Sequence, residues 1–274
     1  MRFTPTFEEK KPNSFTEFVD IIEKLKDRSP SQLWYRGCGK SKYNLTPRLY
    51  RPTTKKKRIE ELANIEIQLM TRFRQRGIPF HNRSLEDDWD ALFFMQHYGI
   101  PTRLLDWTEN PFIALYFAVM SAQFEISEMG MRFKYPAAVW VLDPACWNRH
   151  ALKHMTYDQG ILSTIDGPMK AYKPSSTSDD LGELPVALYG AHNSPRIVAQ
   201  RGVFIIFGKN MLPLEKLYQK NGFPKDCLFK IILSKRILPK MRQSILNHGI
   251  TESVVFPDLE GLAKEIRRDF NFEV

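Results

Sequence analysis

Apolar positions recur at helical spacing in several stretches of the chain, with capping residues at their ends. Ser14 begins the first stretch, and Glu17 completes a capping box. The same pattern predicts helices at residues 57–76, at 85–98 between Ser84 and Gly99, from Asn110 and Pro111 through Ala122, at 238–247 and at 258–270. The helix that begins at Asn110 is apolar on nearly every side, so we expect it to be buried.

Short apolar runs predict strands at residues 32–36, 137–142, 203–207, 228–233 and 253–256. These strands are scattered among the helices without regular βαβ alternation. That order favours an α+β fold with a mixed central sheet and flanking helices over a doubly wound parallel fold. The stretch 154–185 has little periodicity, and we interpret it as a long loop, either a lid or a flexible insertion.

The chain length of 274 residues fits a single domain spanning residues 1–274. The first residues contain no apolar segment, and the longest apolar run is shorter than the roughly 20 residues that cross a bilayer. Three widely separated cysteines form no CxxC pair, and the six histidines lack metal-ligand spacing. We therefore expect a cytoplasmic protein without a secretory signal, a membrane span or a metal.

Positive charge is concentrated in one part of the sequence. The net charge is +9, and ten Lys and Arg residues stand against three acidic ones between Arg48 and Arg83. A basic face attracts phosphates, although a run of charges can also be a solvated surface. If the partner is RNA or DNA, the residues expected to contact it are Lys55, Lys56, Lys57, Arg58, Arg72 and Arg76.

Arg36 stands at the end of an apolar strand and is followed by Gly37. Because arginine keeps its charge, a partly buried one needs an anionic partner. The partner is either a carboxylate of the protein, such as Asp106, or a phosphate held by the guanidinium fork. Gly37 would let the backbone come close to such a ligand.

The stretch from Gln96 to Asn110 is polar and rich in aromatic residues, and we interpret it as a loop between two apolar helices. Asp106 and Asn110 have the character of structural residues, which cap a helix or hold the loop. A ligand-binding role is favoured for three others, namely His97, Thr102 and Arg103.

Two later side chains have both a structural and a functional interpretation. Tyr116 lies in the apolar helix, where core packing is the usual role, but its hydroxyl needs a partner if it is buried. Gln200 precedes a strand and is either an ordinary amide at a strand end or a ligand for a ribose hydroxyl or a carboxamide. P-loop, Rossmann, zinc-hydrolase and serine-hydrolase signatures are all missing from the sequence.

Two motifs together resemble the FRG domain family, which is named after a Phe-Arg-Gly triplet. Tyr35-Arg36-Gly37 matches the triplet with Tyr in place of Phe, and residues 43–48 with Arg51 continue the motif. Residues 96–108 and 114–118 resemble the central motif of the family. Residues 196–204 and 249–259 also look like the family, so the resemblance covers a core of about residues 15–266.

The resemblance further implies an ADP-ribosyltransferase-like fold and site layout, with NAD as the substrate. By that layout the catalytic residues are Arg36, Tyr116, Gln200 and Glu252, and the NAD-binding residues are Tyr35, Arg36, Gly37, Arg48, His97, Thr102, Arg103 and Trp107. Gln200 stands where such enzymes often have Glu, so Glu252 or Asp106 is expected to supply the carboxylate. The implied protein is a toxin or phage-defence effector that modifies nucleic acid or protein, which leaves room for a neutralising partner protein.

Two other functions remain open at this point. The first is a non-catalytic sensor module that binds a nucleotide or a nucleic acid without turnover. The second is a metal-dependent nuclease, which would need a cluster of carboxylates around Asp106, Glu109 or Asp143.

Overall fold

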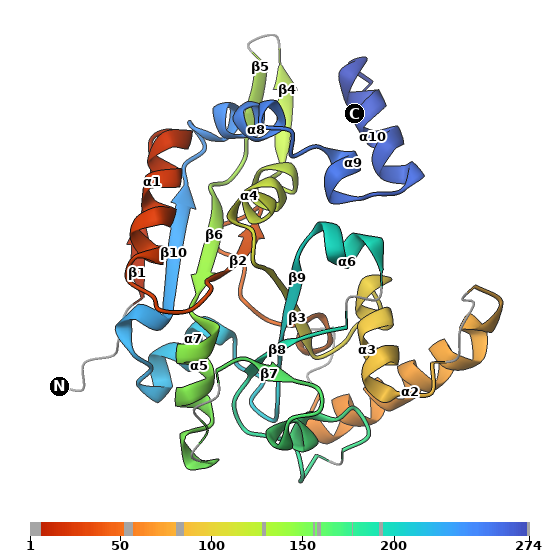
Figure 1. Cartoon of the computed structure of the whole chain (residues 1–274). Coiled ribbons are helices and arrows are strands. Elements are labelled where there is room, and N and C mark those ends of the chain that lie inside the picture. Colours follow the sequence, from red (N-terminus) through yellow and green to blue (C-terminus); the bar gives the residue numbers. More distant parts are fainter. Residues whose placement is uncertain are drawn as a thin grey trace.

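The centre of the protein is one mixed sheet of eight strands (Figure 1). The computed structural model describes residues 7–51, 57–80, 85–127, 130–155, 157, 160–176, 178–191 and 194–272. Across the sheet the strands are β1 (Glu8–Lys10), β10 (Leu228–Leu233), β6 (Ala137–Leu142), β2 (Trp34–Cys38), β3 (Leu104–Thr108), β9 (Gly202–Ile206), β8 (Val186–Tyr189) and β7 (Leu162–Ser163). The two outermost pairs are parallel and the five pairs between them are antiparallel. The predicted α+β class with a mixed sheet is therefore confirmed.

Two apolar clusters cover the two faces of the sheet. One is built by helices α1 (Phe15–Lys26), α4 (Pro111–Met120) and α8 (Leu238–Asn247). The other is built by α2 (Ile59–Gly77), α3 (Asp88–His97), α5 (Pro144–Ala151) and α7 (Leu214–Asn221). The sheet is thus the middle of three layers, as apolar strands need cover on both sides.

The remaining elements lie outside these layers. A separate hairpin is formed by β4 (Phe124–Ser127) and β5 (Gly130–Phe133). Two short helices are α6 (Pro195–Ala199) and α9 (Glu252–Val255), and the longer α10 (Leu259–Asp269) packs on α9 near the C-terminal end (Figure 1). Segments of 3₁₀ helix are η1 (Arg48–Tyr50), η2 (Ile78–Phe80), η3 (Lys153–Met155), η4 (Gly167–Tyr172) and η5 (Lys225–Cys227).

Local capping explains where several helices begin. The Ser14 hydroxyl accepts a hydrogen bond from the Glu17 amide at 3.1 Å, and the Asn110 side chain accepts one from the Phe112 amide at 2.9 Å. Each bond satisfies a backbone donor that the first helical turn leaves open. The helices predicted at these two positions, and the one predicted at residues 238–247, are therefore confirmed.

Several expectations from the sequence need correction. The predicted strand at residues 253–256 is wrong, because Glu252–Val255 forms the helical turn α9. The predicted loop at residues 96–110 contains the strand β3. Asp87 caps α3 by accepting from the amides of Trp89 and Asp90, whereas Ser84 lies outside the described residues. The stretch 154–185 includes β7 and η4.

The sheet is split between its two central strands. β2 pairs with β6 over five residues, and β3 pairs with β9 over five residues. β2 and β3 share a single register pair, Tyr35 with Thr108. Beyond that pair the two strands diverge, so the sheet opens at its centre next to Arg36.

Gly37 lets α4 pack directly on the backbone of β2. A Cβ atom at this position would lie 1.9 Å from the Ala114 carbonyl oxygen and 2.6 Å from the Ala118 amide nitrogen. The space that a Gly37 side chain would need is thus taken by the α4 backbone, and the expected approach of a ligand to the Gly37 backbone stays a prediction. The glycine of the triplet fixes the position of β2 relative to the buried helix.

Replacing Gly37 with Ala should destabilise the fold, because β2 or α4 must move to admit the methyl group. We expect the free energy of unfolding to fall by roughly 1–3 kcal/mol. Gly167→Ala is the control, since no atom lies within 4 Å of a Cβ built there. Urea denaturation followed by tryptophan fluorescence measures both variants, and equal stability of the two would contradict the packing role of Gly37.

Candidate functional site

A cleft of about 250 Å³ opens where β2 and β3 separate, and we call it the Arg36 cleft. Its two nearest walls are residues 35–37 of β2 and residues 106–108 of β3. The C-terminal end of α3, the C-terminal half of α4, and the α6–β9 segment complete the lining. The cleft is therefore a direct consequence of the short β2–β3 pairing.

The Arg36 side chain reaches across the split to β3. Its Nη1 donates a hydrogen bond to the backbone carbonyl of Asp106, and the same nitrogen lies 3.9 Å from the Asp106 carboxylate. The Arg36 side chain is 20% exposed and the Asp106 side chain is 57% exposed. Within the described residues, all but one of the Arg36 N–H groups lack a protein acceptor, and they remain open to water or a ligand.

A second pocket of about 260 Å³ adjoins the cleft and shares Arg36, Gln96 and Asp106 with it. Arg48 and Arg51 also line it, so we call it the arginine pocket. Arg48 donates to the Gly99 carbonyl at 2.7 Å, and Arg51 donates to the Thr46 carbonyl at 3.2 Å. These bonds hold the two side chains beside the pocket.

The arginine pocket is strongly positive. Its lining holds three arginines and one aspartate. Burial, and then the positive charges of Arg36 and Arg48, lower the pKa of Arg51 from its usual value. Three guanidinium groups around one small pocket repel one another, and a bound anion would relieve that repulsion.

Gln96 links the loop before β3 to the cleft. Its amide nitrogen donates to the Asp106 carboxylate at 2.8 Å, and its amide oxygen accepts from the Thr102 hydroxyl at 2.6 Å. The Thr102 hydroxyl in turn accepts from the Leu104 amide at 3.1 Å. This chain fixes the Asp106 carboxylate beside Arg36, and it explains why Thr102 is buried and not exposed to a ligand.

The far wall of the cleft comes from α3 and the α6–β9 segment. His97 Nδ1 lies 3.3 Å from the Ser194 hydroxyl. Burial, and then the positive charge of Arg196, lower the pKa of His97 from its usual value. The Gln200 amide nitrogen donates to the Val255 carbonyl at 3.0 Å, which ties this wall to α9.

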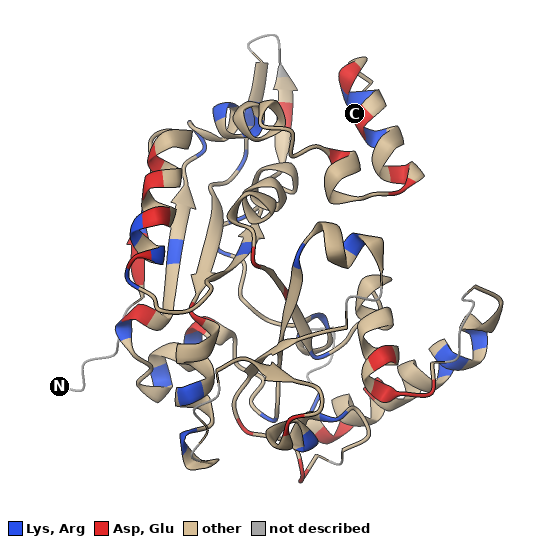
Figure 2. Cartoon of the chain, viewed as in Figure 1, with Lys and Arg blue, Asp and Glu red and all other residues tan. Residues whose placement is uncertain are grey.

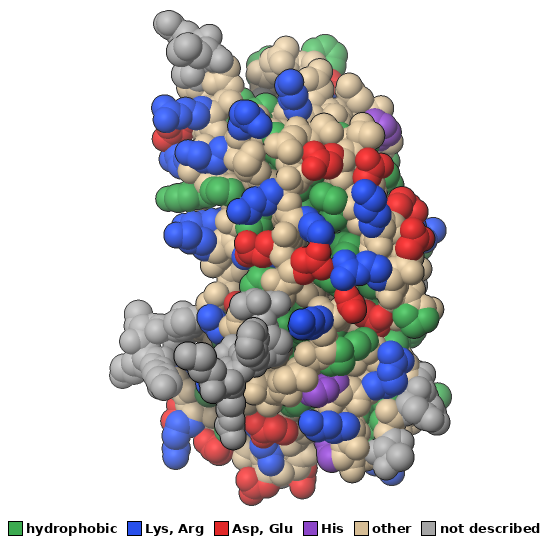
Figure 3. Space-filling view, turned by 90° about the vertical axis from the view of Figure 1, so that its left-hand side faces the viewer, with side chains coloured by type: hydrophobic (Ala, Val, Ile, Leu, Met, Phe, Trp, Pro, Cys, Tyr) green, Lys and Arg blue, Asp and Glu red, His purple; other side chains and the backbone are tan. Residues whose placement is uncertain are grey.

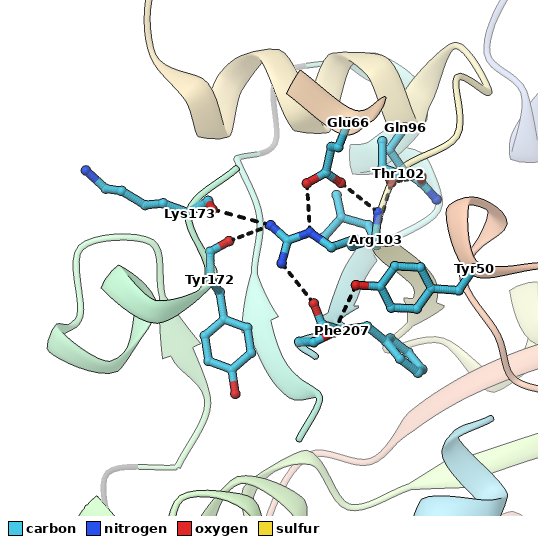
Figure 4. A network of polar contacts seen from close by, with 10 residues as sticks. Tyr50, Glu66, Gln96, Thr102, Arg103, Tyr172, Lys173 and Phe207 are labelled. Carbon is cyan, nitrogen blue, oxygen red and sulfur yellow. Dashed lines mark hydrogen bonds and ion pairs between the residues drawn. The ribbon is translucent and has the colours of Figure 1, made fainter. Parts of the chain in front are cut away.

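Arg103 lies apart from the cleft, although a cofactor-binding role was expected for it. Its Nε donates to the Glu66 carboxylate at 2.7 Å, and its terminal nitrogens donate to the carbonyls of Phe207 and Tyr172 at 3.0 Å each (Figure 4). Both side chains of the ion pair are 1% exposed. Arg103 thus joins α2, η4 and the residue after β9 in the core, and it is absent from the lining of the Arg36 cleft and of the arginine pocket.

Tyr116 and Glu252 are also absent from the cleft lining. Tyr116 is buried in the cluster around α4, and burial, followed by the negative charge of Glu252, raises its pKa. Both carboxylate oxygens of Glu252 accept from Arg268 Nε, at 3.1 and 3.0 Å. The predicted catalytic set therefore separates, with Arg36 and Gln200 at the cleft and these two residues outside it.

Tyr35, His97 and Trp107, three of the predicted NAD-binding residues, do line the cleft. The aromatic lining also includes Phe93 and Phe117. The sequence reasoning missed Phe93 as a site residue, because it looks like any other apolar position of α3. Its place became visible only once the split between β2 and β3 was known.

Those residues predicted to bind nucleic acid that the structure describes lie at two places, the start and the C-terminal end of α2. Lys55 and Lys56 lie outside the described residues. Arg58 pairs with Glu61 at 3.5 Å at the start of α2, and Lys57 borders an apolar groove beside Arg48. Arg72 and Arg76 are exposed near the C-terminal end of α2, where Figure 2 shows basic residues on the ribbon.

Charges of both signs occur on another side of the molecule. On the side of the molecule formed by α1 and β1, basic and acidic side chains are interspersed (Figure 3). Asp143, one of the carboxylates considered for a nuclease, caps α5 and accepts from Ser29 and Ser31 at 2.6 Å each. Among the described residues, no three His, Cys, Asp or Glu side chains gather as a metal site, and no helix is long and apolar enough to cross a membrane.

The sequence model of the FRG domain family matches residues 31–125. The chain carries an FRG domain. The matched range includes β2, α3, β3 and α4, so both sides of the split and Arg36, Gln96 and Asp106 belong to the FRG domain. Arg196 and Gln200 lie outside the match, and the wider resemblance over residues 15–266 stays a prediction. No curated protein and no solved structure matches the chain.

Removing the Arg103 charge should destabilise the FRG domain, because Glu66 would remain buried without its partner. For Arg103→Ala we expect a loss of about 3–5 kcal/mol in the free energy of unfolding. Lys264→Ala is the control, since Lys264 pairs with Glu260 at 2.7 Å on the surface of α10 and its loss should cost about 0.5 kcal/mol or less. A small loss for Arg103→Ala in chemical denaturation would show that the buried pair is not structural.

Proposed function

We propose that the protein binds a nucleotide diphosphate, with NAD as the expected ligand, at the Arg36 cleft and the arginine pocket. The observation that carries the proposal is the position of Arg36. Arg36 lines both cavities, and within the described residues one of its N–H groups donates a hydrogen bond to the protein. A guanidinium held by one bond and otherwise open is suited to bidentate contact with a phosphate.

The chemistry of the two cavities fits the two parts of a nucleotide. The Arg36 cleft is lined by Phe93, Trp107 and Phe117, which offer apolar surface to a base or a nicotinamide ring. The arginine pocket offers Arg48 and Arg51 to the phosphates. Each cavity is small for a whole dinucleotide, since ligand pockets usually measure about 300–1,000 Å³, so the ligand would occupy both.

ADP-ribosyl transfer is the second candidate function, and the exposed Asp106 carboxylate favours it. The bond between ribose C1′ and the nicotinamide nitrogen breaks, and nicotinamide leaves with the bonding electron pair. An acceptor oxygen or nitrogen then bonds to C1′ and loses a proton. We assign to Asp106 the stabilisation of positive charge on the ribose and the uptake of that proton, because one of its oxygens accepts no hydrogen bond from the described residues.

The acceptor and the biological role stay predictions from the family resemblance. They include modification of nucleic acid or protein, and action as a toxin or in phage defence. Binding without turnover, as in a sensor module, is the outcome expected if Asp106 is only a structural partner of Gln96 and Arg36.

The binding proposal predicts that Arg36→Ala loses affinity for NAD. We expect at least about a 30-fold increase in Kd by isothermal titration calorimetry, corresponding to about 2 kcal/mol for a charged partner of a phosphate. Arg236→Ala, which removes an exposed arginine outside both cavities, should leave Kd unchanged. Absence of NAD and ADP-ribose binding by the wild-type protein would reject the proposal.

The transfer proposal predicts a separation of binding from turnover in Asp106→Asn. This variant should bind NAD within about threefold of the wild type, yet lose transfer of labelled ADP-ribose to RNA, DNA or lysate protein by about 100-fold, as general acid–base catalysis contributes about 10²–10⁴-fold. If the wild-type protein binds NAD but transfers no label, the transfer proposal is rejected and the sensor function is supported.

A further inference from the structure

A group of aromatic side chains surrounds a shallow apolar pocket between the C-terminal ends of α2 and α3. The pocket measures about 580 Å³ and is lined by Phe73, Phe80, Phe94 and Tyr98, together with Arg76 and Gly77. We call this surface the aromatic patch. Phe80 is 85% exposed and Tyr98 is 65% exposed, so two rings present much of their surface to solvent.

The charged residue in the described lining of the aromatic patch is basic. Arg76 lines it, and the exposed Arg72 lies one helical turn earlier on α2. Arg74, which lies between them in sequence, is occupied by the Asp88 carboxylate at 2.9 Å and by two backbone carbonyls. Among the described residues that line the patch there is no Asp or Glu.

We propose that the aromatic patch binds unpaired bases of a single-stranded nucleic acid. Exposed aromatic rings stack on bases of any sequence, and flanking arginines contact the phosphates on either side. Phe80 and Tyr98 supply the rings, and Arg72 and Arg76 supply the charge. This assignment concerns a different surface from the nucleotide-binding cavities and does not depend on them.

Helix α3 separates the aromatic patch from the Arg36 cleft. Phe94 and Tyr98 face the patch, whereas Gln96 and His97 line the cleft. The Tyr98 ring packs edge-on against the His97 ring with 4.7 Å between their centroids. Because an α-helix is about 10 Å wide, a strand bound at the patch would pass close to the mouth of the cleft.

A protein partner is the competing occupant, since aromatic residues and arginine are also frequent in protein interfaces. The absence of acidic residues from the described lining, together with the net charge of +9, favours a polyanion. A base-stacking site also predicts a preference that a basic surface alone does not have. Unpaired bases can stack on the rings, whereas bases in a duplex cannot.

The test is fluorescence anisotropy with a labelled single strand of about 12 nucleotides, as RNA and as DNA, and with the matching duplex. We expect the wild type to bind either single strand about tenfold more tightly than the duplex. The double variant Phe80→Ala/Tyr98→Ala should weaken single-strand binding by about tenfold or more for each ring removed. Replacing Arg72 and Arg76 with Gln should lower the slope of log K against log salt by about 0.7 for each phosphate that the variant no longer binds.

The matched control is Phe270→Ala/Phe272→Ala, which removes two aromatic rings that are 71% and 72% exposed near the C-terminal end. It should bind the single strand like the wild type. Melting temperatures of both double variants show that the fold is kept. Equal affinity of the wild type for single strand and duplex, or an unchanged affinity after removal of the Phe80 and Tyr98 rings, would overturn the assignment and leave a protein interface as the use of the patch.

Discussion

The hydrogen bond from Arg36 to the Asp106 carbonyl is the contact on which the site depends. β2 and β3 share one register pair, and beyond it an ordinary ladder would continue. Instead the Arg36 side chain crosses the space between β2 and β3, and the backbones of the two strands stay apart. Gly37 holds β2 against α4 on one side of the split, while five register pairs hold β3 against β9 on the other. The opening is therefore built into the sheet and does not require a loop to move.

This arrangement combines the two interpretations of Arg36 that its sequence position allowed. Arg36 is a structural residue, because its side chain joins the two strands. It also lines two cavities, and within the described residues its other N–H groups have no protein acceptor. The other internal arginines differ in this respect. Arg103 is saturated by Glu66 and backbone carbonyls, and Arg268 is paired with Glu252. The buried charge of Arg103 is thus neutralised by Glu66, whereas the arginine pocket beside the split holds three arginines and one aspartate.

The periodic parts of the fold were predictable from the sequence, and the contacts across it were not. Helices with a clear cap, such as those beginning after Ser14 and Asn110, follow from local hydrogen bonds. β3 was missed because Asp106 and Thr108 make its short run look like a polar loop. α9 was taken for a strand because Val254 and Val255 favour extended structure, while its tertiary contacts with α10 favour a helical turn.

The residues of the site were likewise predictable only where no contact across the fold decides their role. Arg36, His97, Trp107 and Gln200 were predicted site residues, and the structure gathers them at one cleft. Arg103 looked equally suited to a ligand, because nothing in the sequence shows that Glu66, 37 positions earlier, meets it in the core. Only the packing of α2 against the sheet distinguishes the two arginines.

The most direct test of this account is a crystal structure of the protein with ADP-ribose, which carries the proposed diphosphate without the labile nicotinamide bond. We predict phosphate oxygens within about 3 Å of the Arg36 guanidinium and of Arg48 or Arg51, with β2 and β3 still separated beyond their single register pair. ADP-ribose bound elsewhere, or bound in the cleft with no phosphate near Arg36, would contradict the central claim. In that case the triplet arginine would serve only to join the two halves of the sheet.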